Sequence, residues 1–392
     1  MKLSTLSTSA TLSLGLSTLA TASHINYTIV PGFFEQDDAA TDPSTFDYTA
    51  NNFGLIDQVY DADKSSNSTS GLSIWERFHR QLIYMNVNAP RHVSYKLFFM
   101  GRHGEGYHNA AEDYFGTPAW NCYWALLTGN STTTWFDADL TTEGINQANI
   151  AHEYWLQQYN EHKIRFPDVY YSSPMTRALK TANITFGQLP LKQAGAAQFI
   201  PEVKEGFREG MAMHTCNHRR TKSYIESLFG EWTFEDGFTE EDELWTGTTG
   251  ETSEAQDLRS RAALDDIFQS SFNSNSSVSR SGAVPKGVCS SPDHGHGHGK
   301  KDLIVSITAH SGEISSILRV IGHQAFRLAT GAVIPVLIRA EEMTEELPTT
   351  TAAWTISAYC TEPPATSVSA CVCASSAAPV TSGYPVFATA AY

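Results

Sequence analysis

Positive charge is scarce in this sequence of 392 residues. Lysine and arginine number 26 against 42 aspartates and glutamates, so the formal net charge is −16. This excess of negative charge disfavours nucleic acid as a partner, because the phosphate backbone would be repelled. An anionic small molecule would have to be attracted by a local group of cationic side chains rather than by the protein as a whole.

Long apolar runs are missing as well. No stretch approaches the ~20 consecutive apolar residues of a membrane-spanning helix, and the C-terminal run 380–392 is too polar for a lipid-anchor signal. We therefore expect no membrane partner. Apolar residues still make up 41% of the chain and charged residues 17%, proportions that are typical of a folded globular protein.

Cysteine is rare, since the chain has only six, and their spacing does not resemble a zinc site. In an oxidising compartment an even number of cysteines indicates disulfides. Six cysteines allow fifteen connectivities, however, and the sequence does not choose among them. Cys122 and Cys216 lie near the segments that carry the chemistry below, and either can instead be a buried free thiol.

The N-terminus has the pattern of a secretory leader. Lys2 precedes a weakly apolar stretch at 12–19, and Ala20-Thr21-Ala22 matches the small-residue pattern before a cleavage site. Five N-x-S/T sequons follow, at Asn26, Asn67, Asn130, Asn183 and Asn275. We therefore expect residues 1–22 to be a signal peptide and the mature protein to be secreted, either extracellular or vacuolar, and N-glycosylated.

The remainder of the chain divides by composition into a lead-in, an α/β part and a tail. Residues 23–94 form the lead-in, which we expect to pack on the core, and residues 95–345 alternate strand and helix patterns. Within the α/β part, 231–300 has the composition of an insertion that is first acidic and then rich in Ser, Gly and His. Residues 346–392 form the C-terminal tail.

Strand and helix patterns predict the fold class. Strands are predicted at 95–100, 168–173, 198–203, 302–308 and 332–339, and helices at about 75–84, 142–159, 175–186 and 312–323. This alternation predicts a three-layer α/β sandwich with a mostly parallel central sheet, helices on both faces and cap insertions. Ligands bind such sheets at the carboxyl ends of the strands. His103, Arg177 and His310 each lie just past a predicted strand, so we expect them to converge.

The segment Arg102-His103-Gly104-Glu105-Gly106-Tyr107-His108-Asn109 combines groups that suit phosphoryl transfer. An imidazole can attack phosphorus and hold the phosphoryl group covalently where cations neutralise the equatorial oxygens. Arg102 offers a planar fork of donors for those oxygens, and the glycines let backbone amides approach an anion. Arg91-His92 is also an Arg-His pair, but no strand-to-loop context supports it.

Four motifs in order along the chain resemble the histidine phosphatase superfamily, in its phosphoglycerate-mutase-like branch and fungal phosphomutase-like group. They are Arg102-His103-Gly104-Glu105-x-x-x-Asn109, Ser172-Ser173-Pro174-Met175-Thr176-Arg177-Ala178, Phe207-Arg208-Glu209-Gly210 and Thr308-Ala309-His310-Ser311-Gly312. Gly331-Ala332-Val333-Ile334-Pro335 is also similar to fungal members. The resemblance spans roughly residues 95–340, and four ordered motifs are far more specific than one.

The resemblance implies a role for each of six residues. The catalytic residues would be the nucleophile His103, the general acid Glu209, and His310, which completes the phosphate pocket. The substrate phosphate would be bound by Arg102, Asn109 and Arg177. The implied chemistry needs no metal and no cofactor.

Some assignments near these motifs stay open. Glu202 and Glu205 are alternatives to Glu209 as the acid. Arg219 resembles part of a Cys-Asp-x-Arg element of related proteins, although Asn217 replaces the usual Asp. The alternating His-Gly run 294–298 is typical of a flexible polar loop, with transition-metal binding as the alternative.

We expect a secreted, metal-independent phosphomonoesterase that acts on a small phosphate ester through a phosphohistidine. A phosphoglycerate-type mutase is one alternative, because the same site can return the phosphoryl group to a second hydroxyl. A non-catalytic secreted binding protein on the same scaffold is another, although the nucleophile, the acid and both arginines are present. The acid phosphatase and phytase branch is disfavoured, because Gly106 and His108 replace its Arg and Pro and Ser311 follows His310.

Overall fold

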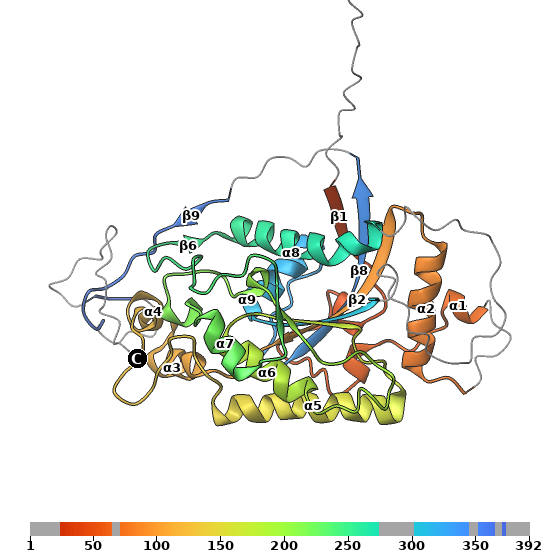
Figure 1. Ribbon diagram of the computed structural model, residues 1–392, viewed down its shortest axis with the longest axis horizontal. Helices are drawn as coiled ribbons and strands as arrows, with labels where there is room; N and C mark the ends of the chain where they lie inside the picture. The colour runs from red at the N-terminus through yellow and green to blue at the C-terminus, as the bar shows by residue number, and fades with distance from the viewer. Residues whose placement is uncertain (1–23, 65–70, 274–301, 345–351, 365–370, 374–392) are drawn as a thin grey trace, which may run out of the picture.

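A seven-stranded sheet forms the centre of the computed structural model, which describes residues 24–64, 71–273, 302–344, 352–364 and 371–373 (Figure 1). Its strands are β1 (His24–Ile29), β2 (Val93–Arg102), β3 (Val169–Ser172), β4 (Glu202–Val203), β5 (Thr233–Phe234), β7 (Ile304–Ala309) and β8 (Val333–Met343). Their order across the sheet is β1-β8-β2-β7-β3-β4-β5. β8 is antiparallel to β1 and β2, and the other neighbours are parallel, so the predicted mostly parallel sheet is confirmed.

The helices in the described residues follow the predicted alternation closely. They are α1 (Asp61–Lys64), α2 (Ile74–Asn88), α3 (Tyr107–Phe115), α4 (Thr117–Cys122), α5 (Thr142–His162), α6 (Thr176–Phe186), α7 (Lys222–Leu228), α8 (Ser253–Asn273) and α9 (Ser311–Val320). Short 3₁₀ turns occur at Glu35–Asp37, Asn52–Gly54, Trp124–Leu126, Glu205–Phe207 and Thr215–Asn217. The four predicted helices correspond to α2, α5, α6 and α9, whereas α1, α4, α7 and α8 lie where no helix is predicted.

The apolar side chains of β2 contribute to two apolar clusters, one on each face of the sheet. Alternate side chains of a strand point to opposite faces of the sheet. Phe98 and Met100 join the apolar cluster with α8 and α9, and Leu97 and Phe99 join the cluster with α2, α5 and α6 on the other face. Because both faces are covered, the strand is apolar throughout rather than alternating. The predicted three-layer sandwich is confirmed.

The lead-in adds an edge strand and an aromatic cluster to this core. β1 pairs with β8 from His24 opposite Met343 to Ile29 opposite Ile338. Phe53 is fully buried, and its ring packs 5.3 Å from Phe99 and 5.0 Å from Trp155 between centroids. The short pair of strands β6 (Gly250–Glu251) and β9 (Trp354–Thr355) lies apart from the main sheet.

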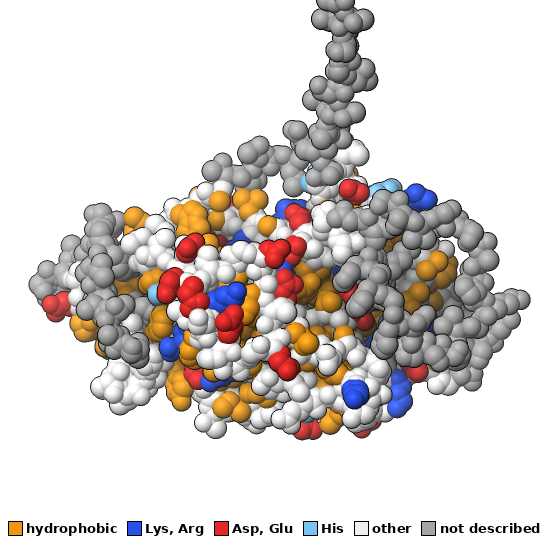
Figure 2. All heavy atoms as spheres, viewed as in Figure 1, with side chains coloured by type: hydrophobic (Ala, Val, Ile, Leu, Met, Phe, Trp, Pro, Cys, Tyr) orange, Lys and Arg blue, Asp and Glu red, His pale blue; other side chains and the backbone are white. Residues whose placement is uncertain are grey.

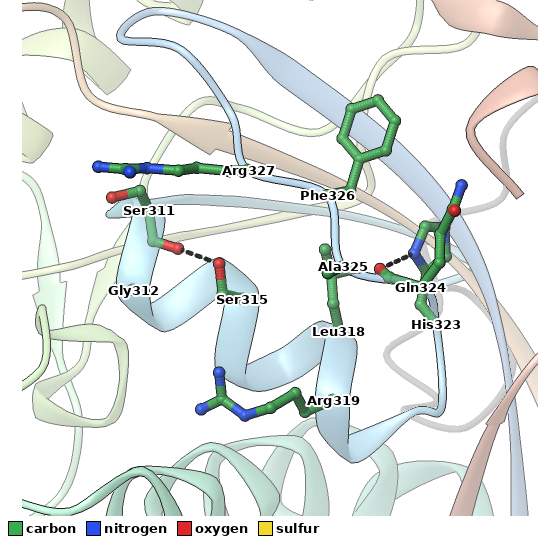
Figure 3. A pocket seen from close by; sticks show the side chains of 10 residues that line it. All are labelled: Ser311, Gly312, Ser315, Leu318, Arg319, His323, Gln324, Ala325, Phe326 and Arg327. Carbon is green, nitrogen blue, oxygen red and sulfur yellow. Dashed lines mark hydrogen bonds between the residues drawn. The ribbon is translucent and has the colours of Figure 1, made fainter. Parts of the chain in front are cut away.

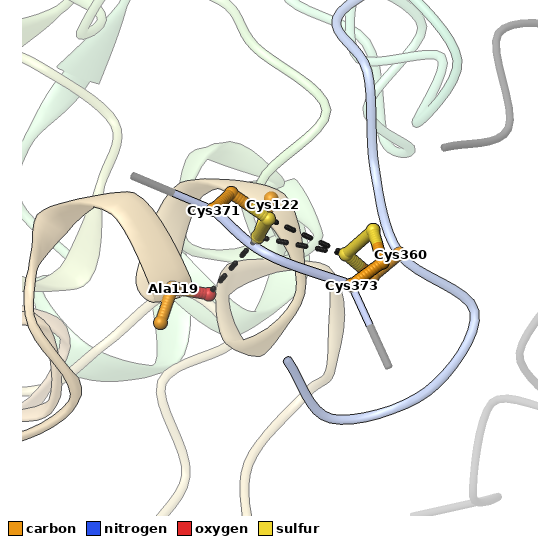
Figure 4. The surroundings of a disulfide bond; sticks show 5 residues. All are labelled: Ala119, Cys122, Cys360, Cys371 and Cys373. Atoms are coloured by element: carbon orange, nitrogen blue, oxygen red, sulfur yellow. Dashed lines mark hydrogen bonds between the residues drawn. A yellow bond between two sulfur atoms is a disulfide. The ribbon is translucent and has the colours of Figure 1, made fainter. Parts of the chain in front are cut away.

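Two disulfides fix C-terminal residues, and one of them joins these residues to α4 (Figure 4). Cys122 on α4 is bonded to Cys371, and Cys360 is bonded to Cys373. The backbone N–H of Cys360 also donates to the carbonyl of Cys122 at 2.8 Å. Cys216 is a buried free thiol, as the sequence allows, and the alternative that Cys122 is free is wrong.

Several exposed carboxylates lie in the insertion, as its acidic composition predicts. Exposed acidic residues between β5 and β6 are Asp236, Glu240, Glu241 and Glu243. Figure 2 shows acidic side chains gathered in the region of α7 and β6. Among the described residues, no helix has the length and apolarity to span a membrane. The predicted signal peptide 1–22, the sequons at Asn67 and Asn275, and the His-Gly run 294–298 lie outside these residues.

Candidate active site

Neighbouring parallel strands end side by side and bring the predicted catalytic segments together. β2 and β7 end at Arg102 and Ala309, which pair in register. His103 and His310 are therefore the first residues past adjacent strand ends, and their ring centroids lie 5.0 Å apart. Arg177 lies in the first turn of α6, with its Nε 3.3 Å from Nε2 of His103. The three side chains converge at the carboxyl edge of the sheet, as predicted.

His103 is held in one tautomer. Its Nδ1 lies 2.7 Å from the carbonyl oxygen of Gly104. A carbonyl oxygen only accepts hydrogen bonds, so Nδ1 carries the hydrogen and Nε2 presents a lone pair. The Nε–H of Arg177 donates to that lone pair. Nε2 is therefore the ring nitrogen that can attack an electrophile, from a side chain that is only 1% exposed.

The electrostatics of the site keep His103 neutral. Burial lowers its pKa well below the ordinary value of 6.5, and the charges of Arg177 and Arg102 lower the pKa further. Burial, followed by the charge of Arg177, also lowers the pKa values of His108 and His310 well below 6.5. A neutral imidazole keeps the lone pair that a nucleophile needs. The same two guanidinium groups give the site the positive charge that an anion requires.

Arg177 is fully buried, and no described carboxylate lies within ion-pair distance of it. Its Nη1 donates to the carbonyl of Cys216 at 2.9 Å. Asp137 anchors the start of α6 by accepting bonds from Thr176, at 2.9 Å from the backbone N–H and 2.6 Å from the hydroxyl. A buried guanidinium without a counter-ion is costly, and an anionic ligand would offset that cost.

Arg102 and His310 offer polar atoms that the described protein leaves unused. Nη1 of Arg102 donates to the carbonyl of Leu328 at 2.8 Å, while its buried Nε has no partner among the described residues. Nε2 of His310 lies 2.7 Å from Oγ of Ser173, and its buried Nδ1 likewise lacks a partner in the described part of the chain. Unpartnered buried polar atoms are rare, and at this edge of the sheet they indicate a ligand site.

The loop after His103 is fixed by close backbone contact. A Cβ on Gly104 would lie 2.2 Å from the carbonyl oxygen of Gly144, and a Cβ on Gly144 would lie 2.1 Å from that of Glu105. Both glycines are therefore needed for the loop to lie against the start of α5. Thr141, the N-cap of α5, also donates its hydroxyl to the carboxylate of Glu105 at 2.6 Å.

The expectation that the glycine-rich loop offers its amides to the anion is wrong for this chain. The N–H of Gly104 donates to Thr181 at 3.0 Å, and the N–H of Gly106 donates to Oδ1 of Asn109 at 3.0 Å. The N–H of Glu105 donates to Gln147 at 2.8 Å. Because the protein itself uses these amides, we expect side chains rather than this loop to contact an anion here. Asn109 is half-buried and caps α3 here, and its role as a phosphate ligand stays a prediction.

Glu209 reaches the same edge of the sheet from the side. Its carboxylate accepts from its neighbour Gly210 at 2.8 Å and from the N–H of Gly312 at 3.2 Å, in the first turn of α9. A Cβ on Gly312 would lie 2.1 Å from Oε1 of Glu209, so only glycine admits this approach. Glu209 is half-buried, which leaves its carboxyl group within reach of solvent and substrate.

The two alternatives to Glu209 are engaged elsewhere. Glu202 lies 3.0 Å from Nζ of Lys204. Glu205 lies 3.2 Å from Arg208 and 2.5 Å from Arg219. These ion pairs make both carboxylates structural, which favours Glu209 as the acid. Arg219 is buried and also donates to backbone carbonyls at 239–241, so it holds this loop in place.

Arg259 on α8 supports the acid from behind, a role that no sequence motif indicates. It donates to the carbonyls of Gly206 at 2.8 Å, Arg208 at 3.1 Å and Glu209 at 3.4 Å. Its charge is balanced by two acidic groups, Glu251 at 2.5 Å and the fully buried Glu313 at 3.0 Å. Burial raises the pKa of Glu313 to about 7, although Arg259 opposes that shift.

His108 and Asp137 are further members of the site that the motifs do not assign. The ring of His108 lies 5.4 Å from that of His103 between centroids, and its buried Nδ1 has no partner among the described residues. Asp137 is 1% exposed and belongs to a loop in which the sequence shows no recognisable motif. Only the position of His108 inside the quoted segment could have drawn attention to it.

Known proteins resemble this chain over most of its length. A "Probable phosphoglycerate mutase" of Arthroderma benhamiae is 43% identical over 82% of this chain and 86% of its own length. "Phosphomutase-like protein 3" of Candida albicans is 32% identical over 85% of this chain and 86% of its own. A solved phosphoserine phosphatase from Entamoeba histolytica is 19% identical over 61% of this chain and 89% of its own, with a TM-score of 0.30.

A family model matches the chain as well. The model of the histidine phosphatase superfamily (branch 1) matches residues 124–290, which include Arg177 and Glu209. His103 and His310 lie outside the matched residues, but the relatives cover them along with most of the chain. Together with the geometry at the sheet edge, these likenesses show that the chain belongs to the histidine phosphatase superfamily.

Proposed function

We propose that the protein is a secreted phosphomonoesterase that hydrolyses a small phosphate ester through a phosphohistidine at His103, without a metal or a cofactor. One observation carries the proposal. A neutral imidazole held in the nucleophilic tautomer lies beside two guanidinium groups that have no carboxylate partner among the described residues. Such a site can accept a phosphate dianion and form a bond to phosphorus.

In the first step Nε2 of His103 attacks phosphorus, and the bond from phosphorus to the ester oxygen breaks. Arg102, Arg177 and His310 bind the remaining phosphate oxygens and neutralise the charge that spreads over them. Glu209, entering in its protonated form, gives its proton to the departing oxygen, so that the product leaves as a neutral alcohol. His103 is left as a phosphohistidine and Glu209 as a carboxylate.

In the second step water attacks the phosphohistidine. The Glu209 carboxylate takes a proton from that water, the bond from nitrogen to phosphorus breaks, and inorganic phosphate leaves. His103 and Glu209 return to their starting protonation states. The hydrogen bond from Nδ1 of His103 to the Gly104 carbonyl keeps the ring in place throughout the cycle.

Secretion and glycosylation are part of the proposal. The leader pattern and the sequons support them, and the Asn130 and Asn183 side chains are exposed and accessible to modification. β1 begins at His24, so cleavage after Ala22 would leave the sheet complete. We expect the mature N-terminus at Ser23 and a loss of mass on treatment with an endoglycosidase. A mature protein that still begins at Met1 would contradict this.

A phosphomutase is the second candidate, because the two relatives above carry mutase names. Hydrolysis differs from a mutase reaction only in whether water or a second hydroxyl receives the phosphoryl group. Release of inorganic phosphate from many esters would favour the hydrolase. Isomerisation of a phosphoglycerate that is stimulated by a bisphosphate, without phosphate release, would favour the mutase. A non-catalytic binding protein would show neither activity.

The decisive experiment replaces the nucleophile. His103→Ala should lower phosphate release from an aryl phosphate at least about 10⁴-fold, since the reaction loses its covalent step. His92→Ala is the matched control, because His92 also follows an arginine but is exposed and lies at the amino end of β2. Full activity of His103→Ala would overturn the proposed function. Activity in the presence of a chelator should equal that in its absence.

A further inference from the structure

A pocket of about 380 Å³ lies along α9, next to the catalytic residues (Figure 3). One wall is formed by α9 from Ser311 to Arg319, and the other by the segment 323–327 that follows the helix. None of the six residues assigned to catalysis or phosphate binding lines this pocket. It is therefore a separate space that adjoins the site without being part of it.

One end of the pocket lies next to Glu209, the proposed general acid. Ser311 and Gly312 line the pocket, and the N–H of Gly312 donates to Oε2 of Glu209 at 3.2 Å. The acid must lie against the oxygen of the departing alcohol in order to protonate it. The alcohol therefore leaves on the side of Glu209, which is where this pocket begins.

The pocket also carries a cation of its own. Arg327 is exposed, lines the pocket and has no ion pair among the described residues. In Figure 3 its side chain extends alongside Ser311, at the end of the pocket that is nearer the catalytic edge. Burial lowers the pKa of Arg102, Glu209 opposes that shift, and the charge of Arg327 lowers the pKa further. Arg319, the other arginine of the pocket, is already paired with Asp257 at 2.6 Å.

The rest of the pocket lining combines polar and apolar side chains and is firmly held, with Ser315, His323 and Gln324 as its polar members. Leu318, Ala325 and Phe326 supply its apolar surface. The ring of Phe326 packs edge-on against Phe46 of the lead-in, 5.5 Å apart between centroids. Nε2 of Gln324 donates to carbonyls of the lead-in at 2.6 and 2.7 Å. The lead-in therefore fixes the wall opposite α9, and the pocket is preformed.

We propose that this pocket binds the alcohol part of the substrate, and that this alcohol has an apolar body and a second anionic group. The apolar body lies on Leu318, Ala325 and Phe326, and the anionic group, a carboxylate or a second phosphate, pairs with Arg327. The inference rests on the proposed function, because it needs Glu209 to act on the leaving oxygen.

The size of the pocket agrees with such an alcohol. One molecule of liquid water occupies about 30 Å³, so 380 Å³ corresponds to about a dozen non-hydrogen atoms. A substituted aromatic or comparable alcohol fills this space, whereas a three-carbon hydroxy acid leaves much of it empty. An alcohol with no anionic group would leave the guanidinium of Arg327 without a partner.

The test compares three phosphate monoesters with full-length enzyme: 4-methylphenyl phosphate, 4-carboxyphenyl phosphate and 1,4-phenylene bisphosphate. For Arg327→Gln we expect kcat/KM to fall about tenfold on an ester with the second anionic group and less than about twofold on the methyl ester. Arg327→Lys should recover part of the loss. Arg165→Gln, an exposed arginine just before β3 at the amino edge of the sheet, should change none of the three values.

Each outcome has a defined meaning. A loss on either anionic ester but not on the methyl ester supports the inference, and the ester that is affected identifies the anion. An equal loss on all three, or no loss on any, overturns it. If the wild-type enzyme hydrolyses all three equally and His103→Ala hydrolyses none, the inference fails while the proposed function stands. If the wild-type enzyme hydrolyses none, the proposed function itself fails.

Discussion

The arginines on the two sides of the active site differ in their interaction partners. On the nucleophile side, at the strand ends, Arg102 and Arg177 contact only carbonyl groups and an imidazole among the described residues. On the acid side, Arg208, Arg219 and Arg259 are each paired with one or two carboxylates. The difference teaches that the first pair keeps its charge available for a ligand, whereas the second group uses its charge to hold loops in place.

The two sides also differ in how they are built. On the nucleophile side, backbone hydrogen bonds continue the sheet, such as His103 N–H to Ala309 at 2.9 Å and Gly331 N–H to His103 at 3.0 Å. On the acid side, Glu209 follows a 3₁₀ turn in a loop, and the guanidinium of Arg259 satisfies the loop carbonyls. Substitutions should therefore affect activity on the first side and stability on the second.

Among the arginine substitutions that compare the two sides, the largest effect on activity is expected from Arg177→Ala. Loss of the buried cation that we propose binds the phosphate should lower kcat/KM about 10²–10³-fold, while the unfolding free energy falls less than it does for Arg259→Met. No carboxylate of the described residues loses an ion-pair partner in this change. Steady-state kinetics and urea unfolding measure the two effects, with Arg165→Ala as the control. A stability loss as large as that of Arg259→Met would contradict the comparison.

Arg259→Met should instead have a large effect on stability and a small effect on activity. It leaves Glu251 and the buried Glu313 without their cation, so we expect a loss of about 3–5 kcal/mol in unfolding free energy. Activity should fall only about tenfold, because Glu209 is displaced but not removed. Adding Glu313→Gln to Arg259→Met should restore part of the stability, since the buried charge is then gone. If the double variant is no more stable than the single one, Glu313 is not the source of the cost.

The pH dependence of stability should differ in sign between the two sides. On the nucleophile side, burial lowers the pKa values of His103, His108 and His310 well below 6.5. The unfolded chain then binds more protons below pH 6.5, so stability is lost as the pH falls through that value. On the acid side, burial raises the pKa of Glu313 from 4.5 to about 7, so its contribution is lost as the pH rises from 4.5 to 7.

Urea unfolding between about pH 5 and 8 separates these contributions. His108→Gln should reduce the loss of stability below pH 6.5, because one proton-binding difference is removed. Glu313→Gln should instead reduce the loss between pH 4.5 and 7. If both substitutions changed the slope of unfolding free energy against pH in the same direction, the two sides would not differ in the sign of their pH dependence.

The smallest effect on activity is expected from the disulfides at the C-terminal end, which touch neither side of the site directly. Replacing both Cys122 and Cys371 by serine should cost about 2–4 kcal/mol of stability with kcat/KM within about twofold of wild type. The Cys122–Cys371 disulfide closes a separation of 249 residues, and the Cys360–Cys373 disulfide closes one of 13. Replacing both Cys360 and Cys373 by serine should therefore cost less stability. A large loss of activity in either would place the tail in the catalytic machinery.

Much of the fold follows from local patterns. The runs at 95–100 and 302–308 are buried on both faces and short, which distinguishes strands from helices, and β2 and β7 lie there. The local patterns predict neither β1 nor α8. β1 is a short edge strand that pairs with residues more than 300 positions away. α8 is polar on most of its surface, and its apolar stripe is recognisable only where it packs on α9 and β2.

The sequence by itself determined which residues follow the strand ends, and so it determined that His103, Arg177 and His310 are candidates. Only the tertiary structure showed that the neighbours of Glu209 are held in ion pairs, that the loop amides have internal partners and that Arg259 contacts the Glu209 carbonyl. The physical reason is the range of the interactions. Strand ends are set by local burial, whereas the charges that stay unpaired depend on contacts between segments far apart in the chain.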